Sequence, residues 1–138
     1  ESTIIDLTGK PTILRPGIIT KEKIEKVLRK KIKILQFSKK IKSPGQLKLH
    51  YYPGIPVFMN RNYAIKNQAL IGFGKKFKAD SHHFNLSKNG NLKEVANKLY
   101  STMRKIKKKN FNSIAVIKIP EKGIGKAIND RLSKASNK

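Results

Sequence analysis

The clearest pattern of apolar and polar positions lies in the last third of the chain. Apolar residues at positions 92, 95, 96, 99, 103 and 106 share one face of a helix, with lysines on the opposite face. Residues 114–119 form a nearly unbroken apolar run, which is typical of a parallel strand covered on both faces, and Pro120 ends it. A second helical stripe follows at positions 124, 127, 128, 132 and 135. These elements predict an α/β structure.

The first 42 residues show weaker signals of the same kind. A short strand is expected over residues 3–7, and a second extended piece over residues 10–17 that stops at a Pro-Gly pair. Thr20 can cap a helix whose apolar positions are 24, 27 and 28 and which continues to Lys31. Residues 30–42 permit a short strand. The pattern predicts a small mixed unit.

A different composition separates this unit from the C-terminal elements. Two Pro-Gly pairs and Pro56 fall within residues 43–56, which forbids a continuous helix and argues against a central strand. His50, Tyr51 and Tyr52 place three large side chains in the middle of this stretch. We interpret it as a linker. After it, strands are expected over residues 68–73 and, more weakly, 82–86.

Charge changes the picture only in part. The net charge of +24 is typical of a protein that binds nucleic acid or an anionic surface. However, 27 of the 32 basic residues are lysine and only 5 are arginine, while 18 isoleucines and 11 asparagines are also present. All three abundant types have A/T-rich codons, and arginine is the better ligand for phosphate. Genome composition is therefore favoured over a dedicated nucleic-acid interface.

The composition also excludes several classes of protein. Without cysteine, neither a disulfide framework nor a thiolate metal site can form, which favours an intracellular protein. No apolar stretch approaches the ~20 residues that span a bilayer, so no membrane association is expected. The chain opens with Glu1 directly on a strand-like segment, and we expect a further segment upstream.

Three segments together resemble one family. The strand Ser2-Thr3-Ile4-Ile5-Asp6 followed by Ile13-Leu14-Arg15-Pro16-Gly17 is similar to the end of a YrdC-type domain. Ser43-Pro44-Gly45 with His50-Tyr51 and Pro53 resembles the interdomain linker of the long threonylcarbamoyl-AMP synthases. The C-terminal half resembles their accessory domain, in Asn85-Leu86-Ser87, the helix from Leu92, and the run from Gly123 to Leu132.

This resemblance implies a division of the chain and a reaction. Residues 1–42 would be the tail of a YrdC-like α/β catalytic domain, residues 43–60 the linker, and residues 61–138 a small Rossmann-like accessory domain with a mainly parallel sheet. The family converts ATP, L-threonine and bicarbonate to threonylcarbamoyl-AMP and pyrophosphate, for modification of adenosine 37 in tRNA. The enzyme would be cytoplasmic, and this chain alone would be inactive because most of the substrate pocket lies upstream.

The resemblance also assigns roles to three residues. Ser2 occupies the position that contacts L-threonine, and Arg15 the position that contacts ATP. Tyr51 lies in the linker segment that folds over the active site, where its ring can cover the bound ATP and exclude water. Without the resemblance, Ser2 would be a strand start, Arg15 a surface residue before a turn, and Tyr51 an apolar anchor of the linker. ATP enters as a substrate that Mg²⁺ can accompany, and no metal bound by protein side chains is expected.

Other candidates have plainer interpretations. His82 and His83 invite a metal site, but neighbours in a strand point to opposite faces and no carboxylate is suitably spaced. Residues 72–75 and 123–125 resemble fragments of phosphate loops but lack the remaining motif residues. The second run precedes a helix whose N-terminus could bind an anion, but Gly123 and Gly125 are expected instead to serve a tight turn. For Arg131 a structural ion pair is the default.

Two functions of other classes stay open from the sequence. The chain could be a non-catalytic basic module that binds RNA, including tRNA, through its lysines, or a degraded product of a split gene. Binding to phosphates must weaken steeply with salt, which distinguishes the RNA-binding module from the others.

Overall fold

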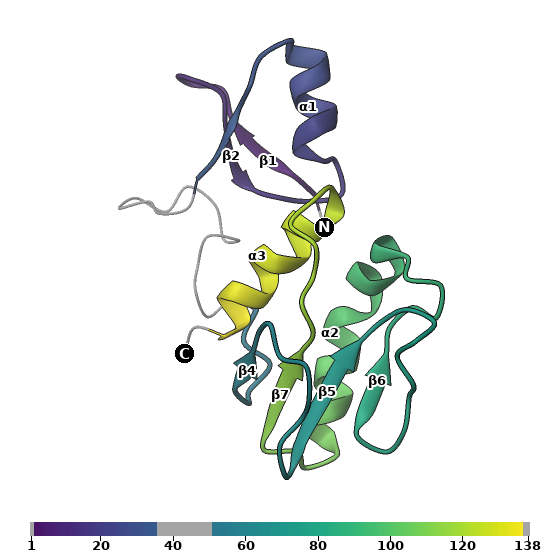
Figure 1. The fold of residues 1–138 in the computed structure, drawn as a ribbon. Helices are drawn as coiled ribbons and strands as arrows, with labels where there is room; N and C mark the ends of the chain where they lie inside the picture. The colour runs from purple at the N-terminus through teal and green to yellow at the C-terminus, as the bar shows by residue number, and fades with distance from the viewer. Residues whose placement is uncertain (1, 36–50, 137–138) are drawn as a thin grey trace.

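The computed structural model describes residues 2–35 and 51–136, which form two sheets and three helices (Figure 1). The N-terminal sheet has the order β1-β2-β3, and the C-terminal sheet has the order β4-β7-β5-β6. Helix α3 lies between the two sheets (Figure 1). Its Lys126 contacts Glu22 and its Arg131 contacts Pro16, and these contacts join α3 to the N-terminal unit. The α/β class expected from the sequence is confirmed.

The N-terminal unit contains the predicted strands and helix. Strands β1 (Ile4–Asp6) and β2 (Thr12–Arg15) pair antiparallel, and β2 pairs parallel with the short strand β3 (Lys33–Ile34). Helix α1 (Lys21–Leu28) begins after Thr20, whose side chain accepts a hydrogen bond from the backbone N–H of Lys23, as predicted. A small core holds this unit together, formed by Ile13, Ile24 and Ile32.

Two details of α1 differ from the prediction. The helix ends at Leu28 instead of continuing to Lys31, because Arg29 adopts the left-handed conformation with φ 53°. Val27 is 81% exposed instead of facing the core. Within the described residues α1 packs on the small sheet β1-β2-β3, and Ile24 and Leu28 make the apolar contacts with it. The extra apolar position of the stripe therefore has nothing to pack against in the described part of the chain.

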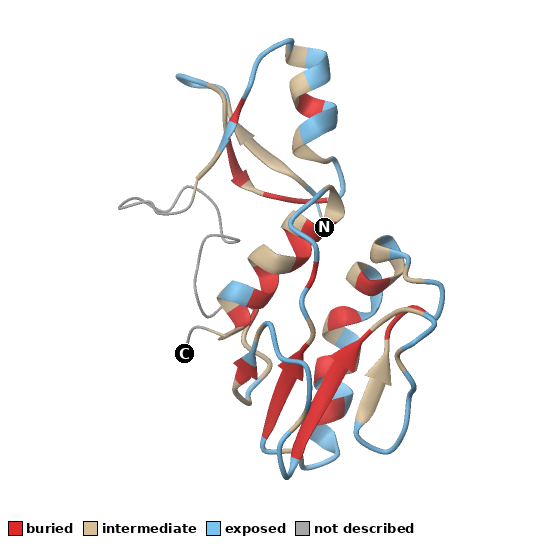
Figure 2. Ribbon diagram, viewed as in Figure 1, coloured by how far each residue is buried: buried red, intermediate tan, exposed pale blue. Residues whose placement is uncertain are grey.

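The C-terminal sheet is entirely parallel, as predicted. Strand β5 (Gln68–Gly72) pairs with β6 (His83–Asn85) on one side and with β7 (Ser113–Val116) on the other, and β7 also pairs with β4 (Val57–Phe58). Every residue of β5 and β7 is buried, whereas β6 at the edge is only partly buried (Figure 2). The apolar run 114–119 leaves the sheet after Val116, so the strand is shorter than the run.

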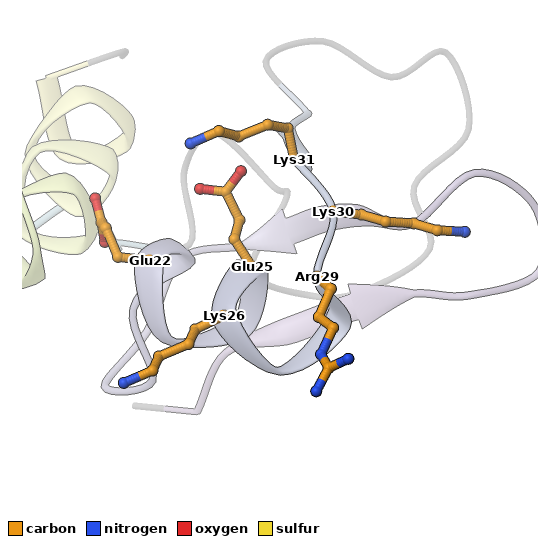
Figure 3. A pocket seen from close by; sticks show the side chains of 6 residues that line it. All are labelled: Glu22, Glu25, Lys26, Arg29, Lys30 and Lys31. Atoms are coloured by element: carbon orange, nitrogen blue, oxygen red, sulfur yellow. The ribbon is translucent and has the colours of Figure 1, made fainter.

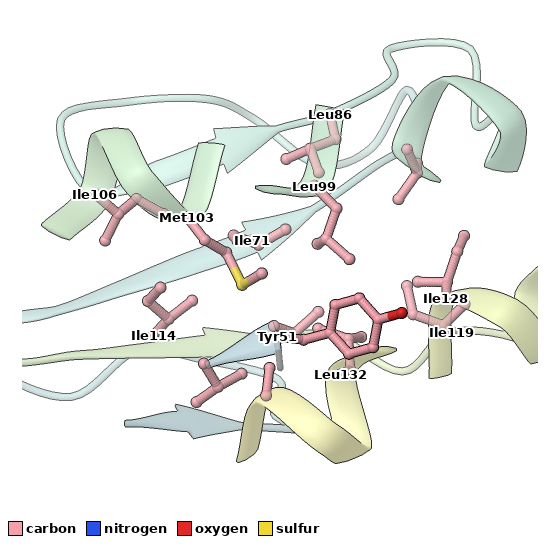
Figure 4. Packing of buried hydrophobic residues seen from close by; sticks show 14 of the residues in the cluster. Tyr51, Ile71, Leu86, Leu99, Met103, Ile106, Ile114, Ile119, Ile128 and Leu132 are labelled. Carbon is pink, nitrogen blue, oxygen red and sulfur yellow. The ribbon is translucent and has the colours of Figure 1, made fainter. Parts of the chain in front are cut away.

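Helices α2 (Leu92–Lys108) and α3 (Ile124–Ser136) complete the C-terminal core. Four of the six apolar side chains predicted for the stripe of α2 are buried, with Met103 and Ile106 at 0% exposure, and Leu92 and Ala96 are partly buried. Figure 4 shows them packed with Ile114 of β7 and with Ile128 and Leu132 of α3. This confirms both helical stripes read from the sequence.

One strand lies where a linker was expected. Val57 and Phe58 form β4 at the edge of the sheet, within the range 43–60. An edge strand tolerates neighbouring prolines because only one of its sides must form hydrogen bonds. Tyr51 and Val57 also belong to the C-terminal core, at 4% and 3% exposure. The boundaries at 42/43 and 60/61 stay predictions.

Candidate functional site

Arg15 and Ser2, two of the three predicted site residues, lie in direct contact. The antiparallel pairing of β1 with β2 places Ile4 opposite Arg15, so Arg15 reaches the residues just before β1. Its Nε and Nη2 atoms donate to the backbone oxygen of Ser2, at 3.1 and 2.9 Å, and Nη2 also donates to Ser2 Oγ at 2.9 Å. The guanidinium therefore holds both the backbone and the hydroxyl of Ser2.

This arrangement suits an anionic ligand. Ser2 is exposed and Arg15 is partly exposed, so a ligand can approach both. A carboxylate or phosphate that meets Ser2 Oγ also meets a planar guanidinium, which forms strong charge-assisted hydrogen bonds with either group. The pair can therefore contribute to the recognition of an amino acid or of a nucleotide phosphate.

The turn that follows Arg15 is held from two directions. Thr3 Oγ1 donates to the backbone oxygen of Ile19 at 2.6 Å, which ties the end of the turn to β1. Arg131 of α3 donates from Nη1 to the backbone oxygen of Pro16, the residue next to Arg15. Pro16 and Gly17 are both buried. Arg15 therefore projects from a segment whose backbone is anchored on each side.

Arg131 was expected to form a structural ion pair, and its Nη1 does lie within ion-pair distance of Asp130, alongside hydrogen bonds to backbone oxygens. The side chain is only 6% exposed, and Nη1 also lies 3.3 Å from the backbone oxygen of Ala127. The carboxylate oxygen of Asp130 lies 3.8 Å from Nη1, farther than either backbone oxygen. A buried guanidinium needs hydrogen-bond acceptors, and backbone carbonyls supply them here. No local pattern around Arg131 predicts this contact, because Pro16 lies 115 positions away.

A second contact joins α3 to the N-terminal unit. Lys126 Nζ lies 2.5 Å from the carboxylate of Glu22 at the start of α1. The hydrogen bond from Lys126, followed by a backbone hydrogen bond within Glu22 itself, lowers the pKa of this carboxyl below its ordinary value. The half-exposed Glu22 makes this a weaker anchor than Arg131.

Tyr51, the third predicted site residue, lies in the C-terminal core. Its ring stacks on Tyr100 of α2, with centroids 5.4 Å apart and an interplanar angle of 24°. Figure 4 shows the ring among the labelled apolar side chains. The guanidinium of Arg131 lies 5.8 Å from the centre of this ring. Arg131 thus contacts both Tyr51 and the turn after Arg15, whereas His50 lies outside the described residues.

The carboxylate of Asp80 lies next to His82 and His83, which was not predicted from the sequence. Asp80 accepts hydrogen bonds from the backbone N–H groups of both histidines, and its Oδ2 lies 2.6 Å from Nδ1 of His83. The backbone bond from His82 and then the side-chain bond from His83 lower the pKa of Asp80 to about 2. The expectation that no carboxylate is suitably spaced is therefore wrong. The spacing Asp-x-His-His was the available signal.

Gly123 and Gly125 serve a turn, as expected, whereas Gly72 lies in close packing. Gly123 has φ +56°, and a Cβ on Gly125 would lie 1.8 Å from the backbone oxygen of Pro120. At Gly72 a Cβ would overlap the ring of Phe77 at 2.3 Å. The contact with backbone at Gly125 excludes a side chain, the positive φ at Gly123 favours glycine, and at Gly72 the Phe77 ring would have to move.

A hollow of about 390 Å³ lies beside α1, but its lining does not converge on a ligand. Figure 3 shows the side chains pointing in different directions. Glu25 accepts a hydrogen bond from the backbone N–H of Ile32, which accounts for its position. The hollow is lined by Glu22, Glu25, Lys26, Arg29, Lys30 and Lys31. It has the character of a solvated surface.

None of the helices in the described part of the chain is long and apolar enough to cross a membrane.

Known proteins resemble this chain over nearly its whole length. Threonylcarbamoyl-AMP synthase of Pyrococcus abyssi is 31% identical over 157 residues, and that of Bacillus subtilis is 29% identical over 156. Both alignments cover 99% of this chain and 45% of the relative, so the chain spans less than half the length of these relatives.

Solved structures agree with this result. The crystal structure of P. abyssi Sua5 complexed with L-threonine matches with a TM-score of 0.80 and 29% identity, over 99% of this chain and 45% of that one. A form of P. abyssi Sua5 with a consecutive histidine and tyrosine replaced by alanine matches with a TM-score of 0.78 and 27% identity, over 99% and 44%. The family model described as threonylcarbamoyl-AMP synthase, C-terminal domain, matches residues 19–137. The chain therefore belongs to the family of threonylcarbamoyl-AMP synthase C-terminal domains.

Proposed function

We propose that this chain is the C-terminal part of an enzyme that makes threonylcarbamoyl-AMP from ATP, L-threonine and bicarbonate. The product would supply the threonylcarbamoyl group for adenosine 37 of tRNA, and the reaction would take place in the cytoplasm. In this proposal residues 1–42 complete a catalytic domain, residues 43–60 connect it, and residues 61–138 form the accessory domain. Catalysis requires the catalytic segment that the relatives carry before this region.

The contact between Arg15 and Ser2 carries the proposal. Two residues assigned to different substrates, ATP and L-threonine, lie within hydrogen-bond distance of each other. A reaction that joins the carbamoylated amino acid to the nucleotide needs both substrates side by side, since correct positioning is a large part of catalysis. The L-threonine bound to P. abyssi Sua5 further supports the assignment of an amino-acid substrate.

Each residue has a defined role in this proposal. Arg15 pairs with phosphate oxygens of ATP, and Ser2 forms a hydrogen bond with L-threonine. Tyr51 covers the reacting groups and excludes water, which protects a carbamate intermediate. The last role requires the linker to move, because Tyr51 is buried against Tyr100 here. In one solved form of P. abyssi Sua5 a consecutive His-Tyr pair is replaced by alanine, which supports a functional role for such a pair. His50-Tyr51 is the one such pair in this sequence.

The test compares this chain with a full-length enzyme. The purified chain alone is expected to release no pyrophosphate that depends on ATP, threonine and bicarbonate together. The same chain preceded by the catalytic segment, taken from the genome or from a relative, is expected to release it. Activity of the chain alone would contradict the proposal, and so would inactivity of a folded full-length enzyme that binds neither substrate.

We propose RNA binding as a second candidate, favoured by one surface of the C-terminal unit. A hollow of about 380 Å³ beside the loop after β4 exposes Phe58 and Tyr63, at 41% and 72%, and the guanidinium of Arg61 lies 5.7 Å from the Phe58 ring. Aromatic rings and arginine stack on unpaired bases, while the +24 charge attracts phosphates.

Stacking and charge give this candidate a direct test. Binding of the chain to single-stranded RNA is expected to weaken steeply as salt rises, and Tyr63→Ala is expected to weaken it at every salt concentration. Binding with the salt dependence but without an effect of Tyr63→Ala would indicate non-specific attraction by the lysines alone.

A further inference from the structure

Asp80, His82 and His83 gather three potential metal ligands in one turn at the edge of the C-terminal sheet. One ligand atom from each residue lies within 4.8 Å of the other two. Nδ1 of His83 lies 2.6 Å from Asp80 Oδ2, and Nδ1 of His82 lies 3.4 Å from Asp80 Oδ1. Both imidazoles therefore face the same carboxylate.

The local backbone brings the two histidines to one side. Neighbouring residues within a strand point to opposite faces, but β6 starts only at His83, and His82 belongs to the preceding bend. Asp80 Oδ1 accepts from the backbone N–H groups of His82 and His83, at 2.9 and 2.8 Å. As a result the ring centroids are 4.3 Å apart. Phe77 packs edge-on against His83 at 5.9 Å and restricts that ring further.

We propose that Asp80, His82 and His83 form a binding site for a divalent metal ion of the class of Zn²⁺, Co²⁺ and Ni²⁺. Two imidazole nitrogens and one carboxylate oxygen are the donor set that such ions prefer, whereas Mg²⁺ and Ca²⁺ prefer oxygen ligands alone. The proposal is independent of the reaction proposed above, because none of the three residues contacts Ser2, Arg15 or Tyr51 through the contacts described here.

The site is accessible and needs little rearrangement. The side chains of Asp80 and His82 are each 47% exposed and that of His83 is 28% exposed, so an ion can enter and retain water at its remaining positions. Ligand atoms in a tetrahedral zinc site are about 3.3 Å apart, given bonds of about 2.0 Å. Small side-chain rotations at an exposed edge are sufficient to reach this spacing. The ion would replace the hydrogen bond between Asp80 and His83.

The composition of the chain leaves few other residues that could bind such an ion. There is no cysteine, and His50 is the single histidine outside the cluster. The full chain, free of any histidine tag, is titrated with Co²⁺ and with Zn²⁺ by calorimetry and by the visible spectrum of Co²⁺. We expect one ion per chain, and Mg²⁺ in excess should not compete.

Single substitutions then locate the ion. His82→Ala, His83→Ala and Asp80→Asn are each expected to weaken binding by at least the roughly tenfold loss that follows removal of even an outer partner of a metal ligand. His50→Ala is the matched control and should bind as the unchanged chain does, and circular dichroism checks that every variant folds. The proposal is overturned if binding does not saturate at one ion, if the three substitutions leave it unchanged, or if His50→Ala abolishes it.

Discussion

The guanidinium of Arg131 donates a hydrogen bond to the backbone oxygen of Pro16, and both residues are buried. The same guanidinium lies 5.8 Å from the ring centre of Tyr51. One side chain of α3 therefore connects the turn after Arg15 with the segment that carries Tyr51. In the proposed enzyme this side chain would hold the turn after Arg15 against α3.

Arg131→Met should destabilise the chain by about 1.5–3 kcal/mol, because it removes a charged donor from a buried carbonyl oxygen. Urea unfolding measures this loss, and hydrogen exchange should show faster opening of residues 12–18 in particular. Arg104→Met is the matched control, since Arg104 is exposed on α2 and its loss should change stability by less than about 0.5 kcal/mol. Equal effects of the two substitutions would show that the contact with Pro16 contributes nothing.

Arg15→Ala in the full-length enzyme should weaken ATP binding by about 1.5–3 kcal/mol, the contribution of a charge-assisted hydrogen bond. Arg15→Lys should recover only part of this loss, because lysine keeps the charge but not the planar fork. Direct binding of ATP to the purified variants measures both effects. Arg104→Ala serves as the control, as Arg104 is exposed on α2. An unchanged ATP affinity in Arg15→Ala would show that Arg15 does not contact ATP and serves only the structure of the turn.

Tyr51→Ala in the same enzyme should lower the yield of threonylcarbamoyl-AMP per pyrophosphate released, because water that reaches the site can cleave ATP to AMP and pyrophosphate or hydrolyse the threonylcarbamoyl-AMP formed. Tyr51→Phe should keep most of this protection. The ratio of the two products does not depend on how much enzyme is folded, so it separates shielding from the packing of Tyr51 against Tyr100. If Tyr51→Ala reduces stability but leaves the ratio unchanged, Tyr51 only anchors the linker.

The Asp80 carboxyl should titrate with a pKa of about 2, below its ordinary value of 3.8. Since the folded pKa is depressed, the contribution of this carboxylate to stability is fully present above pH 3.8 and is lost as the pH falls through about 2. NMR titration of the side-chain carbon of Asp80 measures this value without added metal. In His83→Ala the pKa should rise part of the way, because the backbone bond from His82 remains. A midpoint near 3.8 in the unchanged chain would contradict the geometry of the turn.

A fragment of residues 43–138 should melt cooperatively and at a higher temperature than one of residues 61–138. The shorter fragment lacks Tyr51 and Val57, both of which are buried in the C-terminal core. Burial of one such side chain contributes about 1.5–3 kcal/mol, so the shorter fragment should be less stable by roughly 3 kcal/mol or more. Calorimetry of both fragments measures the difference. Equal melting temperatures would place the start of the accessory domain at residue 61.

The sequence alone determined the elements whose signal is local. The stripe of α2, the buried run of β7 and the cap at Thr20 all depend on residues within a few positions of each other, and each appears in the structure. The ordered motifs also predicted the family, which the comparisons confirm. The roles of Ser2 and Arg15 that follow from it stay predictions. The extent of α1 was less predictable, because the exposure of Val27 depends on how much sheet is available to cover it.

Tertiary structure decided the contacts between distant or conformationally variable residues. Arg131 shows no local sign of binding Pro16, because the two meet only when α3 packs between the sheets. Tyr51 reads equally well as a lid or as an anchor until the stacking on Tyr100 places it in the core. His82 and His83 face Asp80 together because the strand starts between them, at a boundary set by the pairing of β6 with β5. Periodicity determines which side of an element is apolar, whereas packing determines what that side meets.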